Sequence, residues 1–174
     1  MNDGDAAVVK QQLGADDIFA LEAAARCVHG KPAVLLLSPV ASDGETPRFT
    51  AIATPLWLSC PYLNKKIHAL ESAGTIAAIQ AELSANKNFA SEMKRAGDEY
   101  AVYRKKLFNK YFTGSTISVQ ITERLASGIG GTTSSGIKCL HAHAAHYIAL
   151  GDNLIGRQVM ELLHGDVCCA AGDC

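Results

Sequence analysis

The segment KCLHAHAAH, residues 138–146, gathers a lysine, a cysteine and three histidines. If a helix begins at Cys139, successive residues advance by about 100°, and Cys139, His143 and His146 share one face. His141 then lies on roughly the opposite side. Two such side chains one helical turn apart can bind one metal ion. The alternative is a helix whose cysteine is buried as a small apolar residue and whose histidines are hydrogen-bonded in the core.

The loop that precedes this segment, GGTTSSG, has the composition that lets backbone N–H groups converge on a phosphate. A P-loop requires the pattern G-x-x-x-x-G-K-S/T. Here Lys138 comes one residue late, and Cys139 replaces the hydroxyl residue that binds Mg²⁺, which argues against a P-loop NTPase. A more general anion site stays open, and the alternative is a loop that only caps the next helix. The candidate anion-binding residues of this loop are Gly131, Ser135, Gly136 and Lys138.

Arg104 is a further candidate for anion binding. It follows Tyr100 by one helical turn in the segment 89–112, whose apolar residues recur near helical spacing. A guanidinium can hold a carboxylate or a phosphate through two parallel hydrogen bonds. The alternative is an arginine that packs on tyrosine at the helix surface.

Length and composition indicate an ordinary globular chain. Its 174 residues favour a single domain, 1–174, with a cysteine-rich tail at 166–174. A net charge of −1 gives no reason to expect specific nucleic-acid binding. The chain lacks both an apolar stretch of membrane-spanning length and a signal-peptide pattern, so we expect a cytoplasmic protein without membrane association. In a reducing compartment, the six cysteines are expected to be ligands, reactive thiols or buried residues rather than disulfides.

Short strands are predicted in the first third of the chain. The apolar runs 32–40 and 48–60 are bounded by turn signals, and Pro55 favours an edge or a bulge. The segment 17–27 is ambiguous, because its alanines favour a helix but its position suits the first strand of a meander.

Helices are predicted for most of the rest. Pro61 is a good first helical residue, and Gly74 is a natural stop. Further helices are expected at 75–86, 89–112, 139–150 and 154–165. Residues 117–121 could form a short strand.

Several pieces of the chain, spread over about residues 9–160, resemble a bacterial family known as domain of unknown function 501. They are QQLG, RCVHGKPAV, WLSCP, LESAG, YAVYRKKL, GIKCLHAHAAHY and GDNLIGR, in that order. The resemblance implies an α+β fold, a small antiparallel β-meander packed against a mainly α-helical remainder, with 17–27 as the first strand. It supplies no activity.

The resemblance also implies a set of motif residues. In some members of the family the position of Cys60 is a histidine, and cysteine and histidine interchange as metal ligands but not as buried apolar residues. His143 lies outside the motif although its helical phase is right, whereas His141 lies inside it with the wrong phase. This conflict predicts either an irregular helix start near Cys139 or only one histidine in the site. The motif residues are Cys27, Cys60, Cys139, His141 and His146.

The leading hypothesis is therefore a metal-binding protein whose ligands come from three separate segments. Zinc is the first choice, and an iron–sulfur cluster is the alternative because three cysteines could hold one. A second hypothesis is an enzyme that acts on a phosphorylated or anionic small molecule bound by the loop, Lys138 and Arg104. A third is a structural or partner-binding protein with buried cysteines. The expected metal ligands are Cys27, Cys60, Cys139 and one or both of His141 and His146.

Overall fold

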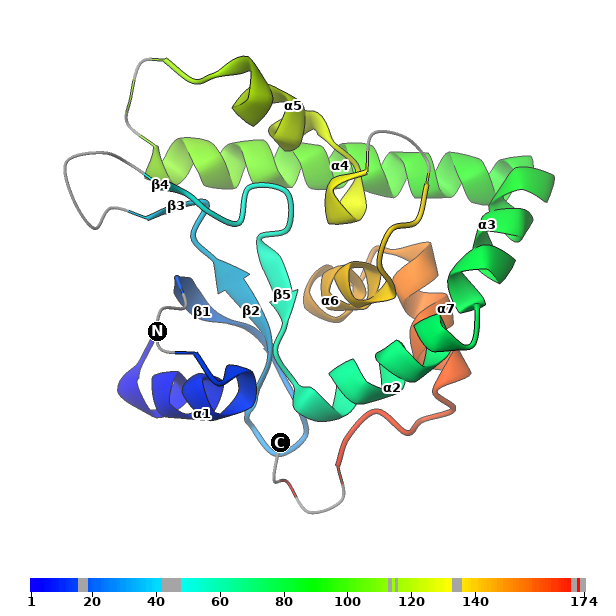
Figure 1. The fold of residues 1–174 in the computed structure, drawn as a ribbon, viewed down its shortest axis with the longest axis horizontal. Helices are drawn as coiled ribbons and strands as arrows, with labels where there is room; N and C mark the ends of the chain where they lie inside the picture. The colour runs from blue at the N-terminus through cyan, green and yellow to red at the C-terminus, as the bar shows by residue number, and fades with distance from the viewer. Residues whose placement is uncertain are drawn as a thin grey trace.

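The computed structural model describes residues 1–15, 19–41, 48–112, 114, 116–132, 136–169 and 172. In this part of the chain the elements run α1 (Asp3–Leu13), β1 (Ala20–Arg26), β2 (Pro32–Leu37), β3 (Val40–Ala41), β4 (Arg48–Phe49), β5 (Leu56–Leu58), α2 (Pro61–Ser72), α3 (Thr75–Ala85), α4 (Lys87–Tyr111), α5 (Val119–Ala126), the 3-10 turn η1 (Ile129–Gly131), α6 (Leu140–Leu150) and α7 (Leu154–Leu162). Figure 1 shows α4 across the upper part of the molecule with α5 above it, the sheet below it and α6 beside β5.

The sheet has three antiparallel strands in the order β1–β2–β5. The central strand β2 is buried from residue 32 to residue 36, as its unbroken apolar sequence requires. Strands β3 and β4 form a separate two-stranded sheet, inserted between β2 and β5. The predicted α+β class, a small antiparallel meander packed against a mainly helical remainder, is confirmed.

The alanine-rich segment 17–27 is a strand, β1, over its described residues 20–26. It pairs with β2 over the whole of its length, for example Ala23 opposite Leu35. The backbone N–H and C=O groups of the buried β2 need partners on both sides, and β1 supplies them on one. This requirement overrides the helix preference of alanine.

The strand predicted for 48–60 is shorter than expected. Only 48–49 and 56–58 are strand, and the chain between them is irregular. Pro55 directly precedes β5, and β5 is an edge strand of the three-stranded sheet, as the proline predicted. Proline has no N–H to donate to a ladder, which explains why the strand begins only after it.

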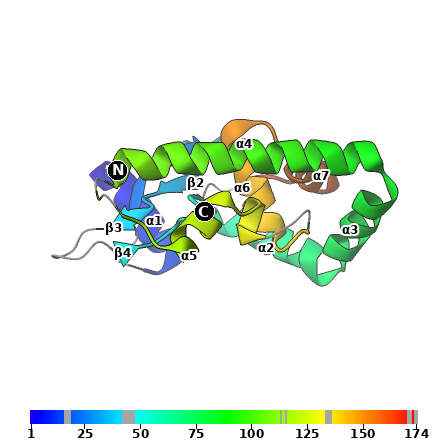
Figure 2. The ribbon, with the colours of Figure 1, turned by 90° about the horizontal axis from the view of Figure 1, so that it is seen from above.

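The middle of the chain is helical as predicted. Helix α2 begins at Pro61 with Cys60 as its N-cap, and α3 follows directly after Gly74, whose φ is 85°. Helix α4 runs along one side of the molecule for most of its length (Figure 2). Its buried residues recur every three or four positions, which gives the helix one continuous inward face. They are Phe89, Met93, Ala96, Tyr100, Arg104 and Phe108.

The strand expected at 117–121 is wrong, because this segment enters the helix α5. The Ser118 hydroxyl accepts a hydrogen bond from the backbone N–H of Ile121 at 3.3 Å and so caps the helix. Ile121 and Leu125, one turn apart, then pack against Phe108 and Ile52. The N-cap and this apolar pair explain why residues 119–126 form a helix.

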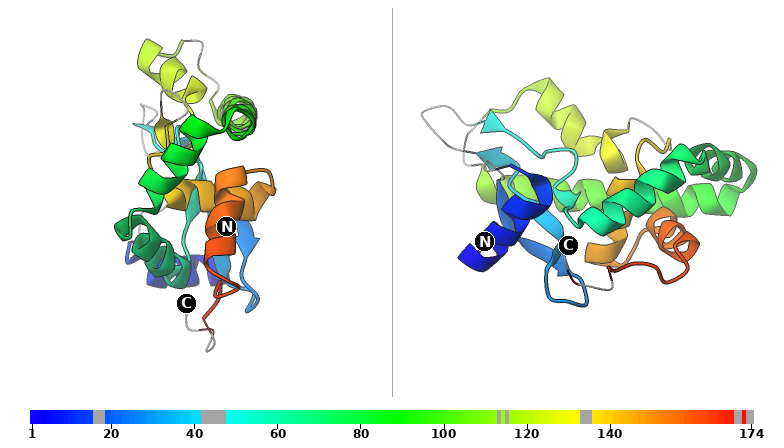
Figure 3. Two further views of the ribbon diagram at one scale, coloured as in Figure 1. Left: turned by 90° about the vertical axis from the view of Figure 1, so that its right-hand side faces the viewer. Right: turned by 60° about the horizontal axis from the view of Figure 1, so that its bottom comes forward.

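Helices α6 and α7 pack closely together beside the sheet (Figure 3). Gly156 of α7 faces the α6 backbone, and a Cβ at this position would lie 2.2 Å from the carbonyl oxygen of His143. Asn153 caps α7 by accepting a hydrogen bond from Gly156 N at 2.7 Å. The helix predicted for 154–165 ends at Leu162. Among the described helices, none has both the length and the apolar character needed to cross a bilayer.

Candidate metal centre

Cys139 stands just outside the N-terminus of α6. Its backbone is extended (φ −156°, ψ 121°), so it is the N-cap residue, and the first helical residue is Leu140. The helix therefore begins one residue later than predicted, which corresponds to the first of the two predicted alternatives, an irregular helix start near Cys139. Because the chain turns at Cys139, its thiol leaves the helical phase and lies beside His141.

Glu71, near the end of α2, completes a group of three ligand-type side chains with Cys139 and His141. The Nδ1 atom of His141 lies 3.2 Å from Glu71 Oε1 and 3.7 Å from Cys139 Sγ. The three ligand atoms all lie within 4.8 Å of one another. Zinc bonds of about 2.3 Å to sulfur and about 2.0 Å to nitrogen place these two atoms about 3.5 Å apart in a tetrahedral site. The observed separations are close to those that one zinc ion needs.

The Glu71 carboxylate is held in place by the helix that it faces. Its Oε1 atom accepts a hydrogen bond of 2.7 Å from the backbone N–H of Leu140. This N–H is one of the donors that the first turn of a helix leaves unpaired, and a negative charge is favourable there. Cys139 makes no side-chain cap. Glu71 thus caps α6 from a different helix, and this bond orients the carboxylate.

The second ring nitrogen of His141 is also oriented. Nε2 lies 3.2 Å from the backbone carbonyl oxygen of Asn64. A carbonyl can only accept, so Nε2 carries a hydrogen, and in the neutral ring Nδ1 holds the lone pair. Metal-binding histidines commonly donate their second N–H to a backbone carbonyl in this way, which fixes the tautomer.

The surroundings of His141 favour positive charge. The hydrogen bond with Cys139, together with the Asn64 carbonyl and the Glu71 carboxylate, raises the pKa of His141 to about 9 against the effect of partial burial. The same acceptors would stabilise a divalent cation, with which the proton on Nδ1 would compete.

A cavity of about 480 Å³ opens beside this group. Cys139 and His141 line it, as does the exposed Lys138. Most of its wall is apolar, which is typical of small-molecule sites that use a few polar groups. The apolar residues that line it include Leu13, Leu56, Trp57, Leu58 and Ala142.

Two of the predicted ligands lie elsewhere. Cys60 is 1% exposed and belongs to the hydrophobic core, and His146 packs its ring edge-on against Tyr100, with the ring centroids 4.5 Å apart. Burial lowers the pKa of His146 to about 4. Neither residue belongs to the groups of described side chains that could hold an ion. The spacing of His146 predicted that it shares a helix face with Cys139. Because Cys139 precedes the helix, this spacing does not bring the two side chains together.

Cys27 and His143 also stand apart from Cys139. Cys27 follows β1 and hydrogen bonds with Cys168 of the C-terminal segment. His143 is buried with its Nδ1 atom 3.2 Å from the Asn153 side-chain oxygen, and burial lowers its pKa to about 4. It is a hydrogen-bonded core histidine, the alternative that its alanine-rich helix suggested.

Arg104 does not face an anion site. It is 1% exposed, its Nη1 atom donates to the carbonyl oxygens of Ala53 at 2.9 Å and Gly128 at 3.0 Å, and its guanidinium lies 5.0 Å from the centroid of the Tyr100 ring. Nη2 donates to the carbonyl oxygens of Leu125 and Ser127. These donors are committed to backbone carbonyls, and Arg104 is not among the residues that line the cavity beside Lys138.

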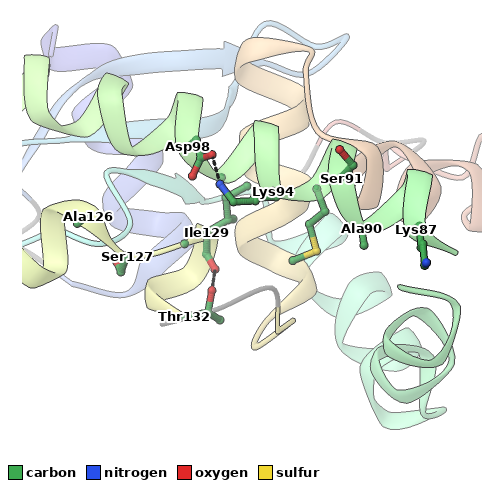
Figure 4. Close-up of a pocket in the computed structure, with 12 residues that line it drawn as sticks. Lys87, Ala90, Ser91, Lys94, Asp98, Ala126, Ser127, Ile129 and Thr132 are labelled. Atoms are coloured by element: carbon green, nitrogen blue, oxygen red, sulfur yellow. Dashed lines mark hydrogen bonds and ion pairs between the residues drawn. The ribbon is translucent and has the colours of Figure 1, made fainter. Parts of the chain in front are cut away.

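Residues at the start of the glycine-rich loop line two different cavities. Gly130 lines the cavity beside Cys139, whereas Ile129 and Thr132 line another of about 620 Å³ against α4. Figure 4 shows this second cavity, in which Lys94 pairs with Asp98 at 2.5 Å. Among the described residues that line it there is no cysteine or histidine.

The predicted loop residues have different surroundings. Gly131 has a φ of 77°, and a Cβ there would lie 3.4 Å from that of Ala53, so its role is in the turn. Gly136 is half-buried, and Ser135 lies outside the described residues. Among the described members of this set, Lys138 lines the cavity beside Cys139.

Two residues of the site have only a weak signal in the sequence. Glu71 lies in the motif LESAG, but one carboxylate on a helix does not by itself indicate a partner 70 residues away. Asn64 contributes its backbone carbonyl, a group that every residue carries. Both reach His141 only through the packing of α2 against α6.

Comparison with known proteins agrees with the motifs. A search of curated proteins and a search of solved structures each gave no significant match. The model of one protein family matches residues 23–161, a region that contains Glu71, Cys139 and His141. The chain therefore belongs to the family described as "Protein of unknown function (DUF501)".

Proposed function

We propose that this protein binds a zinc ion through Glu71, Cys139 and His141. The observation that carries the proposal is the fixed ring of His141, whose Nε2 donates to a backbone carbonyl while Nδ1 faces a thiol and a carboxylate. Three protein ligands are typical of catalytic zinc sites, in which water or substrate takes the fourth position, and zinc binds nitrogen, sulfur and oxygen donors. The adjoining cavity would give a small molecule access to that position.

Zinc suits this donor set better than the alternative cofactor. Iron–sulfur clusters are held mainly by cysteine thiolates. The group around His141 offers one thiol, one imidazole and one carboxylate. Zinc accepts all three ligand types with similar bond lengths.

The test is the metal content of the native protein, purified without chelator and measured by elemental analysis. We expect Cys139→Ser and Glu71→Gln each to lose one equivalent of zinc relative to the wild type. His68→Ala is the matched control, because His68 is an exposed histidine on the same helix as Glu71. Wild-type zinc content in both site variants would overturn the proposal.

A second candidate function is an enzyme that acts on an anionic small molecule. The observation in its favour is that Lys138 lines the same cavity as Cys139 and His141. The amino end of α6 also lies there, and helix N-termini attract anions. A phosphorylated ligand should raise the melting temperature of the zinc-loaded protein, and Lys138→Ala should abolish that rise. If no ligand in an anion library raises it, this function is wrong.

A further inference from the structure

A second group of ligand-type side chains lies where the C-terminal segment meets the turn between β1 and β2. After α7 the chain returns along the lower edge of the molecule to this turn, and the two views in Figure 3 agree with Figure 1 on this path. The ligand atoms of His29, Cys168 and Cys169 all lie within 4.8 Å of one another. Cys168 and Cys169 lie outside the region that matches the family.

The His29 ring is oriented by the segment that it faces. Its Nε2 atom lies 2.8 Å from the backbone carbonyl oxygen of Cys169. Since the carbonyl can only accept, the hydrogen is on Nε2, and Nδ1 carries the lone pair of the neutral ring. This is the same arrangement as at His141, and it prepares an imidazole for metal binding.

A third thiol, that of Cys27, adjoins this group without being one of the three ligand atoms that lie within 4.8 Å of one another. The Cys27 side chain hydrogen bonds with that of Cys168, and the backbone amide of Val28 also hydrogen bonds with Cys168. Thiolates so close together repel one another, and a divalent cation between them would remove that repulsion.

The turn that carries Cys27 and His29 has a defined shape. Cys27 N donates to Lys31 O and Gly30 N donates to Cys27 O, both at 2.9 Å, and Gly30 has a φ of 74°. On the other side, Gly172 comes so close to the His29 ring that a Cβ there would lie 3.1 Å from Nδ1. Both segments are thus shaped around the imidazole before any ion binds.

We propose that Cys27, His29, Cys168 and Cys169 bind a second zinc ion, which fastens the C-terminal segment to the β1–β2 turn. Three thiolates and one imidazole make a Cys₃His set, which is typical of closed structural zinc sites. Each thiol would release its proton to solvent as the ion binds, and no electron is transferred. The protein supplies all four ligands, so this site differs in kind from the open one at His141.

The test is titration of the metal-free, reduced full-length protein with Co²⁺ and then Zn²⁺. We expect two equivalents for the wild type, one for Cys139→Ser, one for Cys168→Ser/Cys169→Ser and none for the combined variant. The thiolate-to-cobalt charge-transfer absorption should be several-fold stronger for the second site than for the first, because it has three sulfur ligands instead of one. The two sites lose metal in different variants, so failure of one proposal is distinguishable from failure of the other.

A single-residue variant keeps the test independent of folding at the C-terminus. His29 is exposed, so His29→Ala should fold normally and bind the second ion at least tenfold more weakly. Limited proteolysis should show a C-terminus that zinc protects in the wild type but not in His29→Ala. Unchanged stoichiometry in Cys168→Ser/Cys169→Ser, or a Cys27–Cys168 disulfide in protein purified under reducing conditions, would overturn this inference.

Discussion

Arg104 shows how a single residue can look functional in the sequence and be structural in the fold. A buried guanidinium without a carboxylate partner must be solvated by other oxygen atoms, because burying an unpaired charge is costly. Among the described residues, backbone carbonyls near 53 and 125–128 supply them. The guanidinium thereby ties α4 to the end of α5 and to the chain before β5.

We predict that Arg104→Lys lowers the free energy of unfolding by about 2–4 kcal/mol, because one ammonium group cannot reach carbonyls on both sides and leaves some of them unpaired. Urea denaturation of the metal-free protein measures this loss. The exposed neighbour Lys105 provides the control, and Lys105→Met should change stability by less than about 0.5 kcal/mol. If Arg104→Lys were as stable as the wild type but had lost anion binding, Arg104 would have a ligand-binding role instead of a structural one.

At the scale of elements, the contact between α6 and α7 depends on one glycine. A Cβ at position 156 would lie 2.2 Å from His143 O and 2.5 Å from the Tyr147 Cβ. Backbone atoms cannot move aside as a flexible side chain can, so the two helices would have to separate. Separation would disturb the Asn153 cap and the buried His143, which lie at this contact.

We predict that Gly156→Ala destabilises the protein by about 3 kcal/mol, at the upper end of the usual cost of overpacking. Gly97→Ala is a matched control, because Gly97 lies inside α4 with nothing within 4 Å of an added Cβ. That change should stabilise the protein by about 0.5–1 kcal/mol through the helix preference of alanine. Thermal denaturation of the two variants should therefore shift in opposite directions, and equal shifts would contradict the packing argument.

At the scale of the whole molecule, three histidines of α6 make stability depend on pH in opposite ways. Burial lowers the pKa of His143 and of His146 to about 4, below the usual 6.5. The unfolded chain then binds more protons than the folded one, so stability falls as pH drops from about 6.5 to about 4. The pKa of His141 is raised to about 9, and its contribution is present below pH 6.5 and is lost as pH rises to about 9.

We predict that the metal-free protein is most stable near pH 6.5–7. Each buried histidine should cost about 3 kcal/mol between neutral pH and pH 4. Urea denaturation between pH 4.5 and pH 9 tests this, and His146→Phe should flatten the acid side of the curve while keeping an aromatic contact with Tyr100. An acid slope that His146→Phe leaves unchanged would contradict the assignment.

Much of the architecture follows from local sequence. Apolar runs predict β2, the 3–4-residue spacing predicts the buried face of α4, and Pro61 marks the start of α2, since these signals act within a few residues. The secondary-structure predictions are uncertain or wrong where contacts with residues distant in the sequence decide the conformation. Strand β1 forms because β2 needs a neighbour, and residues 119–121 join α5 because Ile121 and Leu125 find Phe108 and Ile52.

The candidate site also has one part that the sequence predicts and one part that depends on tertiary contacts. The sequence by itself, through its resemblance to the family, determined that Cys139 and His141 belong to one motif. The conflict of helical phase predicted either an irregular helix start or only one histidine in the site. Only the tertiary structure decided which other residues join them. The packing of α2 brings Glu71 to the site, whereas Cys27 lies beside Cys168 and Cys60 lies in the hydrophobic core. Metal-type side chains can be recognised one at a time, but a ligand set is a matter of distances, and those are set by how the elements pack.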